Sequence, residues 1–335
     1  MINVAINGFG RIGRNFLRAV LKDENALQKI RITAINVGPA KLDSVAHMFK
    51  YDTILGMYPG QVRVKKKELQ IDQHRINIIN ETDPKKISWS EFGVDWALES
   101  SGKFTNRDSA KLHLESGSKK VLITAPSVDE DITIIPGVNN LSYDKEIHNI
   151  VSLGSCTTNA IAPMLKVLHE CFGIKQGFMT TIHSYTNTQV LLDVEKKDLR
   201  RARAACLNMI PTSTGATKVL GKVLPELDGV IGGAAIRVPT ANVSLIDLSF
   251  VAKERISVEK INKIFEKSSQ AGPLSGIIDI SYEPLVSSDY GGNNYSVVID
   301  GLITDVRGQM GKVFGWYDNE WGYSVRLKDF LVDVV

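Results

Sequence analysis

The sequence has little cysteine and no long apolar run, and each shortage excludes a class of protein. Three cysteines among 335 residues are too few for a disulfide framework, and no Cys or His pair has zinc-ligand spacing, so we expect no metal site. No run approaches the length that crosses a bilayer, which predicts no membrane association. Such sparse cysteine use fits a reducing, cytoplasmic setting best.

Neither sign of charge is in large excess, because the formal net charge is only +3. This excess is too mild to predict nucleic-acid binding on its own. At 43% hydrophobic and 23% charged residues, the chain is typical of a globular protein, and 335 residues are enough for two domains. The first residues predict a strand and a glycine turn in place of a signal peptide. No internal repeat is visible.

The chain opens with a glycine motif in the context of strand, turn and helix. Residues 3–7 form an apolar strand that leads into G-F-G-R-I-G at 8–13, and apolar residues at helical spacing follow over 16–21. In a dinucleotide site, Gly8 allows the tight turn, Gly10 lets the pyrophosphate approach, and Gly13 allows close helix packing. We therefore predict a dinucleotide site here; a purely structural glycine turn is the alternative.

A second strand over 30–36 should be followed by an acidic residue that holds the ribose hydroxyls of the cofactor. The chain has Val37 at this point, with Lys41 shortly after it. Valine neither accepts a hydrogen bond nor repels a 2′-phosphate, and a lysine could pair with that phosphate. This predicts tolerance for NADP. In the alternative interpretation Val37 only packs, and NAD is the ligand.

Further strands are predicted over 75–79, 96–99 and 120–124, with helices between them over 42–49 and 107–115. This alternation is typical of a doubly wound parallel sheet, whose ligands bind beyond the carboxyl ends of the strands. Ser101 and Thr124 lie at two such ends, so we predict that they line the cofactor groove; ordinary loops are the alternative. The lysines at 65–67 suggest a solvated edge hairpin.

Cys156 stands where an apolar strand over 150–153 passes into a helix that continues to residue 172. A helix N-terminus favours a thiolate, but it supplies only about 0.3–1 kcal/mol, at best about 2. Lowering the thiol pKa from about 8.5 to about 6 needs about 3.4 kcal/mol, so a partner base or cation is required. Flanking hydroxyls, including Ser155 and Thr157, argue against the alternative of a buried structural cysteine.

His183 has the most site-like surroundings of the six histidines, because it ends a predicted strand among hydroxyl residues. A single histidine is more often structural. However, a cysteine nucleophile needs a base, and a Cys–His pair on separate elements is a common way to activate it. We therefore predict that Cys156 and His183 lie together.

Basic residues and hydroxyls in the second half point to anion binding. Five basic residues lie within 196–203, and the hydroxyl-rich segment 210–216 leads into a helix through Thr214 and Gly215, whose N–H groups can hold an anion. Arg237, on a predicted strand, is a further phosphate partner. With little aromatic interleaving, this favours a small phosphorylated substrate over nucleic acid.

Several motifs together resemble phosphorylating glyceraldehyde-3-phosphate dehydrogenase, collinearly over essentially the whole chain. They are N-G-F-G-R-I-G-R at 7–14, S-C-T-T-N at 155–159, T-I-H-S-Y-T at 181–186, P-T-S-T-G-A at 211–216, R-V-P-T at 237–240 and W-Y-D-N-E-W-G-Y-S at 316–324. The resemblance implies an α/β chain with a Rossmann-type, doubly wound parallel sheet domain and an α+β catalytic domain whose sheet is mostly antiparallel. Expected boundaries are 1–154, with the C-terminal helix 321–335, for the dinucleotide-binding domain and 155–320 for the catalytic domain.

The resemblance also implies an activity in glycolysis or gluconeogenesis. Glyceraldehyde 3-phosphate, inorganic phosphate and NAD or NADP would give 1,3-bisphosphoglycerate through a thioester on Cys156, with His183 as the base. Thr186, Arg201 and Arg237 resemble the site for the substrate's own phosphate. The resemblance assigns the binding of the attacking phosphate to Ser155, Thr157, Thr214 and Gly215. Cofactor contacts are implied at Gly8, Gly10, Arg11, Ile12, Gly13, Ser101, Thr124, Asn319 and Tyr323.

A homotetramer is implied as well, with the loop 190–206 near a neighbouring subunit's cofactor. Departures from the family pattern concern cofactor choice. Val37 replaces the aspartate of NAD-preferring members and Thr82 replaces an arginine, whereas Glu195 would oppose a 2′-phosphate. We predict use of both cofactors. The alternatives are erythrose-4-phosphate dehydrogenase, against which the segment 212–215 argues, and a nucleic-acid or surface-binding protein that uses 196–203.

Overall fold

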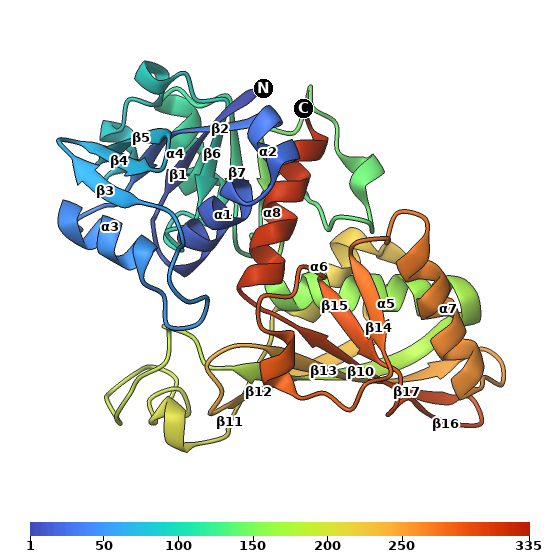
Figure 1. Cartoon of the computed structure of the whole chain (residues 1–335). Coiled ribbons are helices and arrows are strands. Elements are labelled where there is room, and N and C mark those ends of the chain that lie inside the picture. The colour runs from blue at the N-terminus through green and yellow to red at the C-terminus, as the bar shows by residue number, and fades with distance from the viewer. The chain divides into compact units, whose positions relative to one another are not determined.

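The computed structural model describes all residues from 1 to 335, and the chain forms two compact units (Figure 1). The first unit comprises Met1–Ile134, Leu141–Gly154 and Ser324–Val335. The second comprises Ile135–Asn140 and Ser155–Tyr323.

A nine-stranded sheet forms the centre of the first unit, in the order β3-β4-β5-β2-β1-β6-β7-β9-β8. Pairing is parallel from β5 to β8, and β3, β4 and β5 form an antiparallel edge. The strands are β1 (Ile2–Asn7), β2 (Ile30–Asn36), β3 (Val62–Lys65), β4 (Glu68–Ile71), β5 (His74–Ile79), β6 (Trp96–Glu99), β7 (Lys120–Ile123), β8 (Ile132–Thr133) and β9 (Ile150–Ser152). The predicted parallel sheet is confirmed, and so is the lysine hairpin, which turns at Lys66 with φ +56°.

Helices of the first unit follow the strands as the apolar spacing predicts. Phe16, Leu17 and Val20 of α1 are all buried, and this face covers the sheet. The helices are α1 (Arg11–Leu21), α2 (Glu24–Lys29), α3 (Leu42–Lys50) and α4 (Arg107–Glu115), with short 3₁₀ turns η1 (Pro84–Lys86) and η2 (Trp89–Phe92). A further turn, η3 (Asn140–Ser142), spans the point where the chain returns from the second unit to the first.

A buried carboxylate organises the carboxyl edge of this sheet. Glu99, 1% exposed at the end of β6, accepts hydrogen bonds from the Asn7 side chain at 2.6 Å and from the Ser101 backbone N–H at 2.8 Å. The indole of Trp89 donates to His113 Nδ1 at 3.1 Å, so the other ring nitrogen carries the proton that faces Glu99 at 3.0 Å. The ends of β1 and β6 are therefore held together by one side chain.

The second unit is built on a mixed sheet in the order β11-β12-β10-β13-β17-β15-β14, with β16 beside β17. Most neighbours are antiparallel, as predicted; β10·β12 and β14·β15 are the parallel pairs. The strands are β10 (Ile174–Ser184), β11 (Ile210–Thr212), β12 (Ile231–Val238), β13 (Ser244–Ala252), β14 (Ile278–Ser281), β15 (Val297–Asp300), β16 (Asp305–Arg307) and β17 (Met310–Tyr317).

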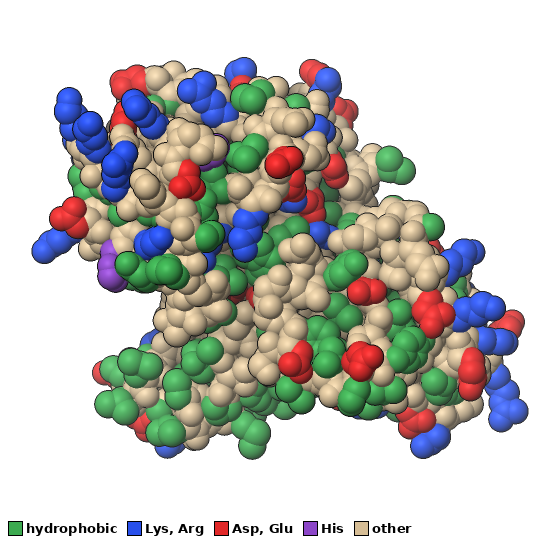
Figure 2. Space-filling model, in the orientation of Figure 1, with side chains coloured by type: hydrophobic (Ala, Val, Ile, Leu, Met, Phe, Trp, Pro, Cys, Tyr) green, Lys and Arg blue, Asp and Glu red, His purple; other side chains and the backbone are tan.

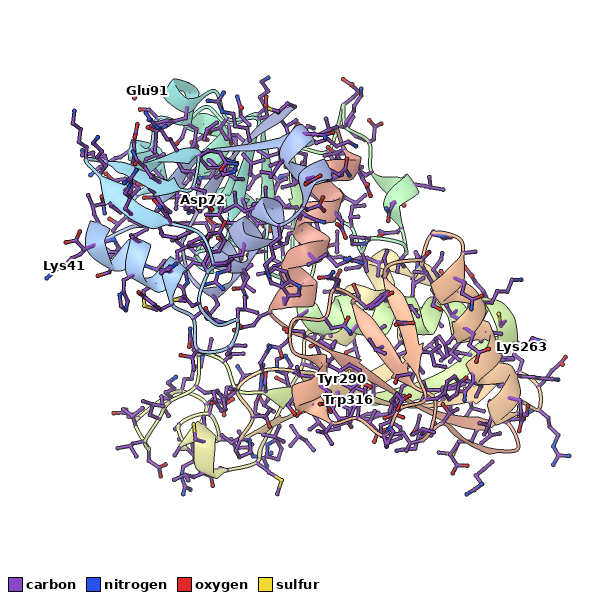
Figure 3. All side chains as sticks on the ribbon, in the orientation of Figure 1. Lys41, Asp72, Glu91, Lys263, Tyr290 and Trp316 are labelled. Atoms are coloured by element: carbon purple, nitrogen blue, oxygen red, sulfur yellow. The ribbon has the colours of Figure 1, made fainter.

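Helices pack on one face of this sheet around a single apolar core. Leu165 of α5, Phe250 of β13 and Phe265 of α7 are all buried within it. On the other side of β17, the rings of Tyr290 and Trp316 stack with centroids 5.4 Å apart (Figure 3). The helices are α5 (Cys156–Phe172), α6 (Ala216–Val223) and α7 (Val258–Gln270), with η4 (Ala205–Leu207), η5 (Pro225–Leu227) and η6 (Ser287–Tyr290).

Two segments differ from the expected boundaries. Residues 135–140 belong to the second unit, because Ile135 and Val138 are buried in its core. The last helix, α8 (Trp321–Asp333), begins in the second unit and continues in the first. The Trp321 indole donates to Asn294 at 2.7 Å, whereas Lys328 pairs with Asp23.

None of the helices combines the length and the apolarity that crossing a bilayer requires. The structure also contains no group of three or more His, Cys, Asp or Glu side chains arranged to hold a metal ion.

The Glu99 hydrogen bonds lead to a stability prediction. In Glu99→Gln an amide N–H₂ replaces one acceptor oxygen and faces N–H donors, so we expect the free energy of unfolding to fall by about 1.5–3 kcal/mol in urea titrations. The matched control is Glu91→Gln at the exposed Glu91 of η2 (Figure 3), which should change it by less than about 0.5 kcal/mol. Equal effects in the two variants would contradict a special role of the buried carboxylate.

Candidate active site

Cys156 is the first residue of α5, as the sequence predicts. Strand β9 ends at Ser152, Gly154 takes φ +61°, and the helix begins after Ser155. Ser155 is the N-cap, and its hydroxyl accepts the backbone N–H of Thr158 at 3.0 Å. The thiol therefore lies in the first helical turn, where backbone N–H groups have no helical partner.

His183 lies beside this thiol, so the predicted pair is brought together. The sulfur of Cys156 is 3.6 Å from Nε2 of His183, which is near the end of β10 and 4% exposed. The imidazole packs edge-on against the ring of Tyr317, with centroids 6.0 Å apart. Residues 27 positions apart in the sequence thus lie in contact, at the separation that a thiol and a base would need.

Burial dominates the electrostatics of the pair. Burial and then the charge of Arg237 lower the pKa of His183 to about 3, so the ring is neutral at physiological pH. Burial also raises the pKa of the Cys156 thiol; the charge of Arg237, followed by hydrogen bonds at Thr157 and the backbone, opposes this only in part. Desolvation therefore outweighs the helix N-terminus and the cation in setting the pKa of this thiol.

Arg237 is held against His183 by the sheet register. The two residues are direct partners in the parallel pair β10·β12, so their side chains leave the same face. One guanidinium nitrogen of Arg237 lies 2.7 Å from His183 Nδ1 and donates to the Ser184 carbonyl at 2.9 Å. Arg237 thus contacts the base as well as lining the space beside it.

A second arginine lies near the first. Arg201 donates through Nε to the Thr212 hydroxyl at 3.0 Å, on the strand next to β12. Burial lowers the pKa of Arg237, and the charge of Arg201 lowers it further. Thr186 follows β10, and its hydroxyl is 2.9 Å from that of Thr188. Two arginine side chains near each other are suited to binding a dianion.

The four residues predicted to bind a second anion differ in how far their side chains are already hydrogen-bonded within the protein. Gly215 caps α6 without a side-chain hydrogen bond, and the Thr214 hydroxyl accepts the Ala216 N–H at 3.2 Å. The Thr157 hydroxyl, however, is buried against the hydroxyl of Tyr317 at 3.0 Å, and that of Ser155 caps α5. Both of the latter side chains are therefore already engaged within the protein.

Tyr317 is a site residue that the sequence reasoning missed. Its hydroxyl lies 3.0 Å from that of Thr157 and 2.7 Å from that of Thr181, and burial raises its pKa. It thereby braces the first turn of α5 against β10. Its place two residues before Asn319, at an inward position of the last strand, is the signal that could have indicated it.

Asn319 is oriented by two buried hydroxyls. Its side-chain oxygen accepts hydrogen bonds from Ser184 at 2.9 Å and from Ser244 at 3.1 Å. Because the oxygen is occupied, the side-chain N–H₂ is the group left to address a ligand. Burial raises the pKa of the nearby Tyr323, and the charge of Cys156 adds to this effect.

The glycine turn of the first unit fits a dinucleotide. A Cβ on Gly8, where φ is +95°, would lie 2.5 Å from the Ser101 backbone, and one on Gly13 would lie 2.3 Å from the Gly8 carbonyl. A Cβ on Gly10 meets nothing within 4 Å, so the turn is open on that side. Gly10 caps α1 without a side chain, which leaves its first N–H groups, that of Ile12 among them, directed toward this opening.

Other predicted cofactor contacts lie at the same edge. The side chain of Arg11 forms an ion pair with Asp52, so its guanidinium is turned to the loop after α3. The Ser101 hydroxyl donates to Glu99 at 2.5 Å, and that of Thr124 donates to the Glu99 carbonyl at 3.0 Å. A cavity of about 190 Å³ opens here between the glycine turn and Val37.

Comparisons with known proteins agree with these two sites. Residues 2–107 match the family model described as "Glyceraldehyde 3-phosphate dehydrogenase, NAD binding domain", and residues 155–319 match its "C-terminal domain". The chain belongs to the glyceraldehyde-3-phosphate dehydrogenase family. Glyceraldehyde-3-phosphate dehydrogenase 1 of Bacillus cereus is 50% identical over 331 residues, 98% of this chain and 97% of the relative. The enzyme of Geobacillus stearothermophilus is 49% identical over 329 residues, 98% and 96%.

Membership of the glyceraldehyde-3-phosphate dehydrogenase family confirms the resemblance drawn from the motifs. The match of the first unit to an NAD binding domain supports a nicotinamide cofactor, which the open glycine turn fits.

The pKa of His183 gives a pH dependence of stability. It is about 3 in the folded chain against 6.5 for an ordinary histidine, so only the unfolded chain gains this proton as pH falls from 6.5 toward 3. Stability is therefore lost on acidification, by about 2 kcal/mol between pH 6.5 and 4.5 from this group. In His183→Asn that part should disappear from urea titrations at the two pH values, with the exposed His47→Asn as control; an unchanged pH dependence would contradict a buried neutral imidazole.

Proposed function

We propose that the chain converts glyceraldehyde 3-phosphate, inorganic phosphate and NAD(P) to 1,3-bisphosphoglycerate and NAD(P)H. The observation that carries this proposal is a thiol 3.6 Å from a neutral imidazole, next to two arginines. A thiol can add to an aldehyde, a neutral imidazole can accept a proton, and two cations suit the phosphate of the substrate.

Cys156 attacks the aldehyde carbon and forms a hemithioacetal. His183 then removes the proton of its hydroxyl group, and the backbone N–H of Cys156 stabilises negative charge on that oxygen. A bound nicotinamide supplies the acceptor for the hydride that leaves the same carbon. The thioester left on Cys156 is cleaved by inorganic phosphate, which yields the acyl phosphate and the free thiol.

Two anion sites serve these steps. Arg201, Arg237 and Thr186 hold the phosphate of the substrate, because the two guanidinium groups lie close together. The attacking phosphate binds at the N-terminus of α6, at Thr214 and Gly215; the N-cap Gly215 has no side chain, and the Thr214 hydroxyl accepts the Ala216 N–H. Ser155 and Thr157 contribute to this second site if their hydroxyls exchange their present partners, the Thr158 N–H and Tyr317, for the phosphate.

The two domains have different roles in this proposal. Residues 1–154, with most of 321–335, bind the cofactor through Gly8, Gly10, Gly13 and the loops at Ser101 and Thr124, and Arg11 and Ile12 border that site. Residues 155–320 carry the chemistry. Asn319 presents its N–H₂ group to the nicotinamide carboxamide, and Tyr323 packs beside it. Three cysteines, none of them in a disulfide, support a cytoplasmic location, which fractionation of producing cells would test.

An apolar loop supports the proposed homotetramer. Figure 2 shows hydrophobic side chains gathered on the segment beside β11. They include Leu191 at 80% exposure, Leu199 at 80% and Leu207 at 78%. Apolar side chains gathered in this way mark an interaction surface. Sedimentation velocity should show a species of four chains, and a monomer at micromolar concentration would contradict the proposal.

The activity prediction uses glyceraldehyde 3-phosphate, inorganic phosphate and either cofactor in a steady-state assay. We expect Cys156→Ser to lower kcat by at least about 10³-fold, because the nucleophile is lost. The matched control is Cys171→Ser, at an exposed thiol on the last turn of α5. Reaction with erythrose 4-phosphate alone would keep the fold assignment and overturn the substrate.

Cofactor choice is proposed to include NADP. Val37 is buried and donates its backbone N–H to the Ile79 carbonyl, so no carboxylate repels a 2′-phosphate there. Lys41, at the start of α3, extends outward (Figure 3) and can approach such a phosphate. Glu81 lines the cavity, and the negative charge of its carboxylate acts against the 2′-phosphate of NADP. One oxygen of this carboxylate accepts the N–H groups of Thr82 and Asp83.

We therefore expect kcat/KM for NAD and NADP to differ by less than about 100-fold, which corresponds to about 2.7 kcal/mol. Val37→Asp should shift the ratio toward NAD by at least about tenfold, because the new carboxylate accepts the ribose hydroxyls and repels the 2′-phosphate. Val37→Asn is the control for size without charge. A larger preference for NAD in the wild type would contradict dual use.

A further inference from the structure

The first unit contains a second cavity, which lies away from the glycine turn. It has a volume of about 410 Å³, against about 190 Å³ for the cavity beside Val37. Pockets that bind small molecules have volumes of about 300–1,000 Å³, so this one is large enough for a ligand. Its walls come from α1, α2, β2 and β5, and no residue among them belongs to the proposed cofactor or anion sites.

The cavity opens where two neighbouring strands of the sheet separate. β2 and β5 pair in parallel only from Ala34 with Asn77 to Asn36 with Ile79. The first residues of β2 are paired on their other edge with β1, and the first residues of β5 are paired on theirs with β4. The two facing edges therefore diverge, and the gap between them is held open by strand pairing on both sides.

The walls of this cavity are apolar and buried. Val20 of α1 is 1% exposed, and Ile30 of β2 and Ile76 of β5 are each 2% exposed. Leu27 of α2 is half-buried and also lines the cavity. Water finds few hydrogen-bond partners on such walls, whereas an alkyl chain is stabilised by each methylene group that it buries there.

The rim of the cavity is cationic. Arg31 and Arg75 are exposed and line it, and neither guanidinium has a hydrogen bond or an ion pair with another residue. No aspartate or glutamate lines the cavity. The carboxylate of Asp72, which is close in sequence, accepts the Tyr58 hydroxyl at 3.2 Å and the Gln61 N–H at 2.8 Å. Two arginines without a carboxylate partner suit an anionic head group.

We propose that this cavity binds a free amphipathic carboxylate, with its alkyl chain between the separated strands and its head group at Arg31 and Arg75. The proposal goes beyond the proposed function and does not depend on it. A free molecule fits better than a membrane surface, because the apolar walls are buried inside the unit. A segment that binds a membrane instead displays its apolar side chains on an exposed face.

The test is isothermal titration of the full chain with decanoate, below the concentration at which decanoate forms micelles and with NAD at saturation. We expect one decanoate bound per chain. Octanoate, which lacks two methylene groups, should bind about tenfold more weakly. Decanol, which has the same chain without the charge, should bind at least about tenfold more weakly. No saturable binding of decanoate, or equal affinity for decanol, would overturn the proposal.

Variants of the rim and of the wall locate the binding. Arg31→Gln and Arg75→Gln should each weaken decanoate by at least about fivefold, because each removes one charged donor. The matched control is Arg255→Gln, at an exposed arginine of the second unit, which should change the affinity by less than about twofold. Leu27→Trp should abolish binding by filling the cavity, with circular dichroism to show that the variant is folded. Unchanged affinity in both variants of the rim would contradict the assignment.

Two further measurements separate this site from other places where an amphiphile could bind. Displacement of decanoate by NAD would overturn the proposal, because binding would then be at the cofactor edge. Binding to vesicles of an anionic phospholipid without binding of free decanoate would also overturn it. In crystals soaked with bromine-labelled decanoate, the anomalous bromine peak should lie beside Ile30 and Ile76, and a peak elsewhere alone would contradict the site. None of these readouts is the activity with glyceraldehyde 3-phosphate, so either proposal can fail while the other stands.

Discussion

The contact between His183 and its two neighbours is the constraint on which the active site depends. One ring nitrogen faces the Cys156 sulfur at the start of α5, and the other faces Arg237, a placement that follows from the parallel register of β10 and β12. A shift of one residue in that register would turn Arg237 to the other face of the sheet. The long β10, which lies between β12 and β13, makes such a shift costly, so the sheet itself fixes the geometry of the base.

Desolvation decides which charges this site can hold. Burial raises the pKa of the thiol and lowers that of the imidazole, so the neutral pair is favoured over thiolate and imidazolium. A helix N-terminus and one cation do not overcome this.

Much of this could be predicted from the sequence because the relevant signals are local. Apolar periodicity located β1, α1 and α5, and glycine spacing located the cofactor turn. Pairing of Cys156 with His183 could be expected from chemistry alone. The thiol pKa could not, since it depends on burial by distant segments. The inward turn of Thr157 to Tyr317 and the contact of Arg237 with Nδ1 were also out of reach, because each joins residues whose distance is set by sheet pairing.

The cofactor edge and the surroundings of the catalytic pair both hold buried polar groups in place by hydrogen bonds. At the edge, Glu99 is buried as an acceptor for fixed donors on Asn7, Ser101 and His113, so its hydrogen bonds make the loops rigid. Beside Cys156 and His183, one guanidinium nitrogen of Arg237 lies 2.7 Å from Nδ1 of His183 and donates to the Ser184 carbonyl at 2.9 Å. Hydrogen bonds that hold the loops rigid suit a surface that must keep one shape for a large ligand.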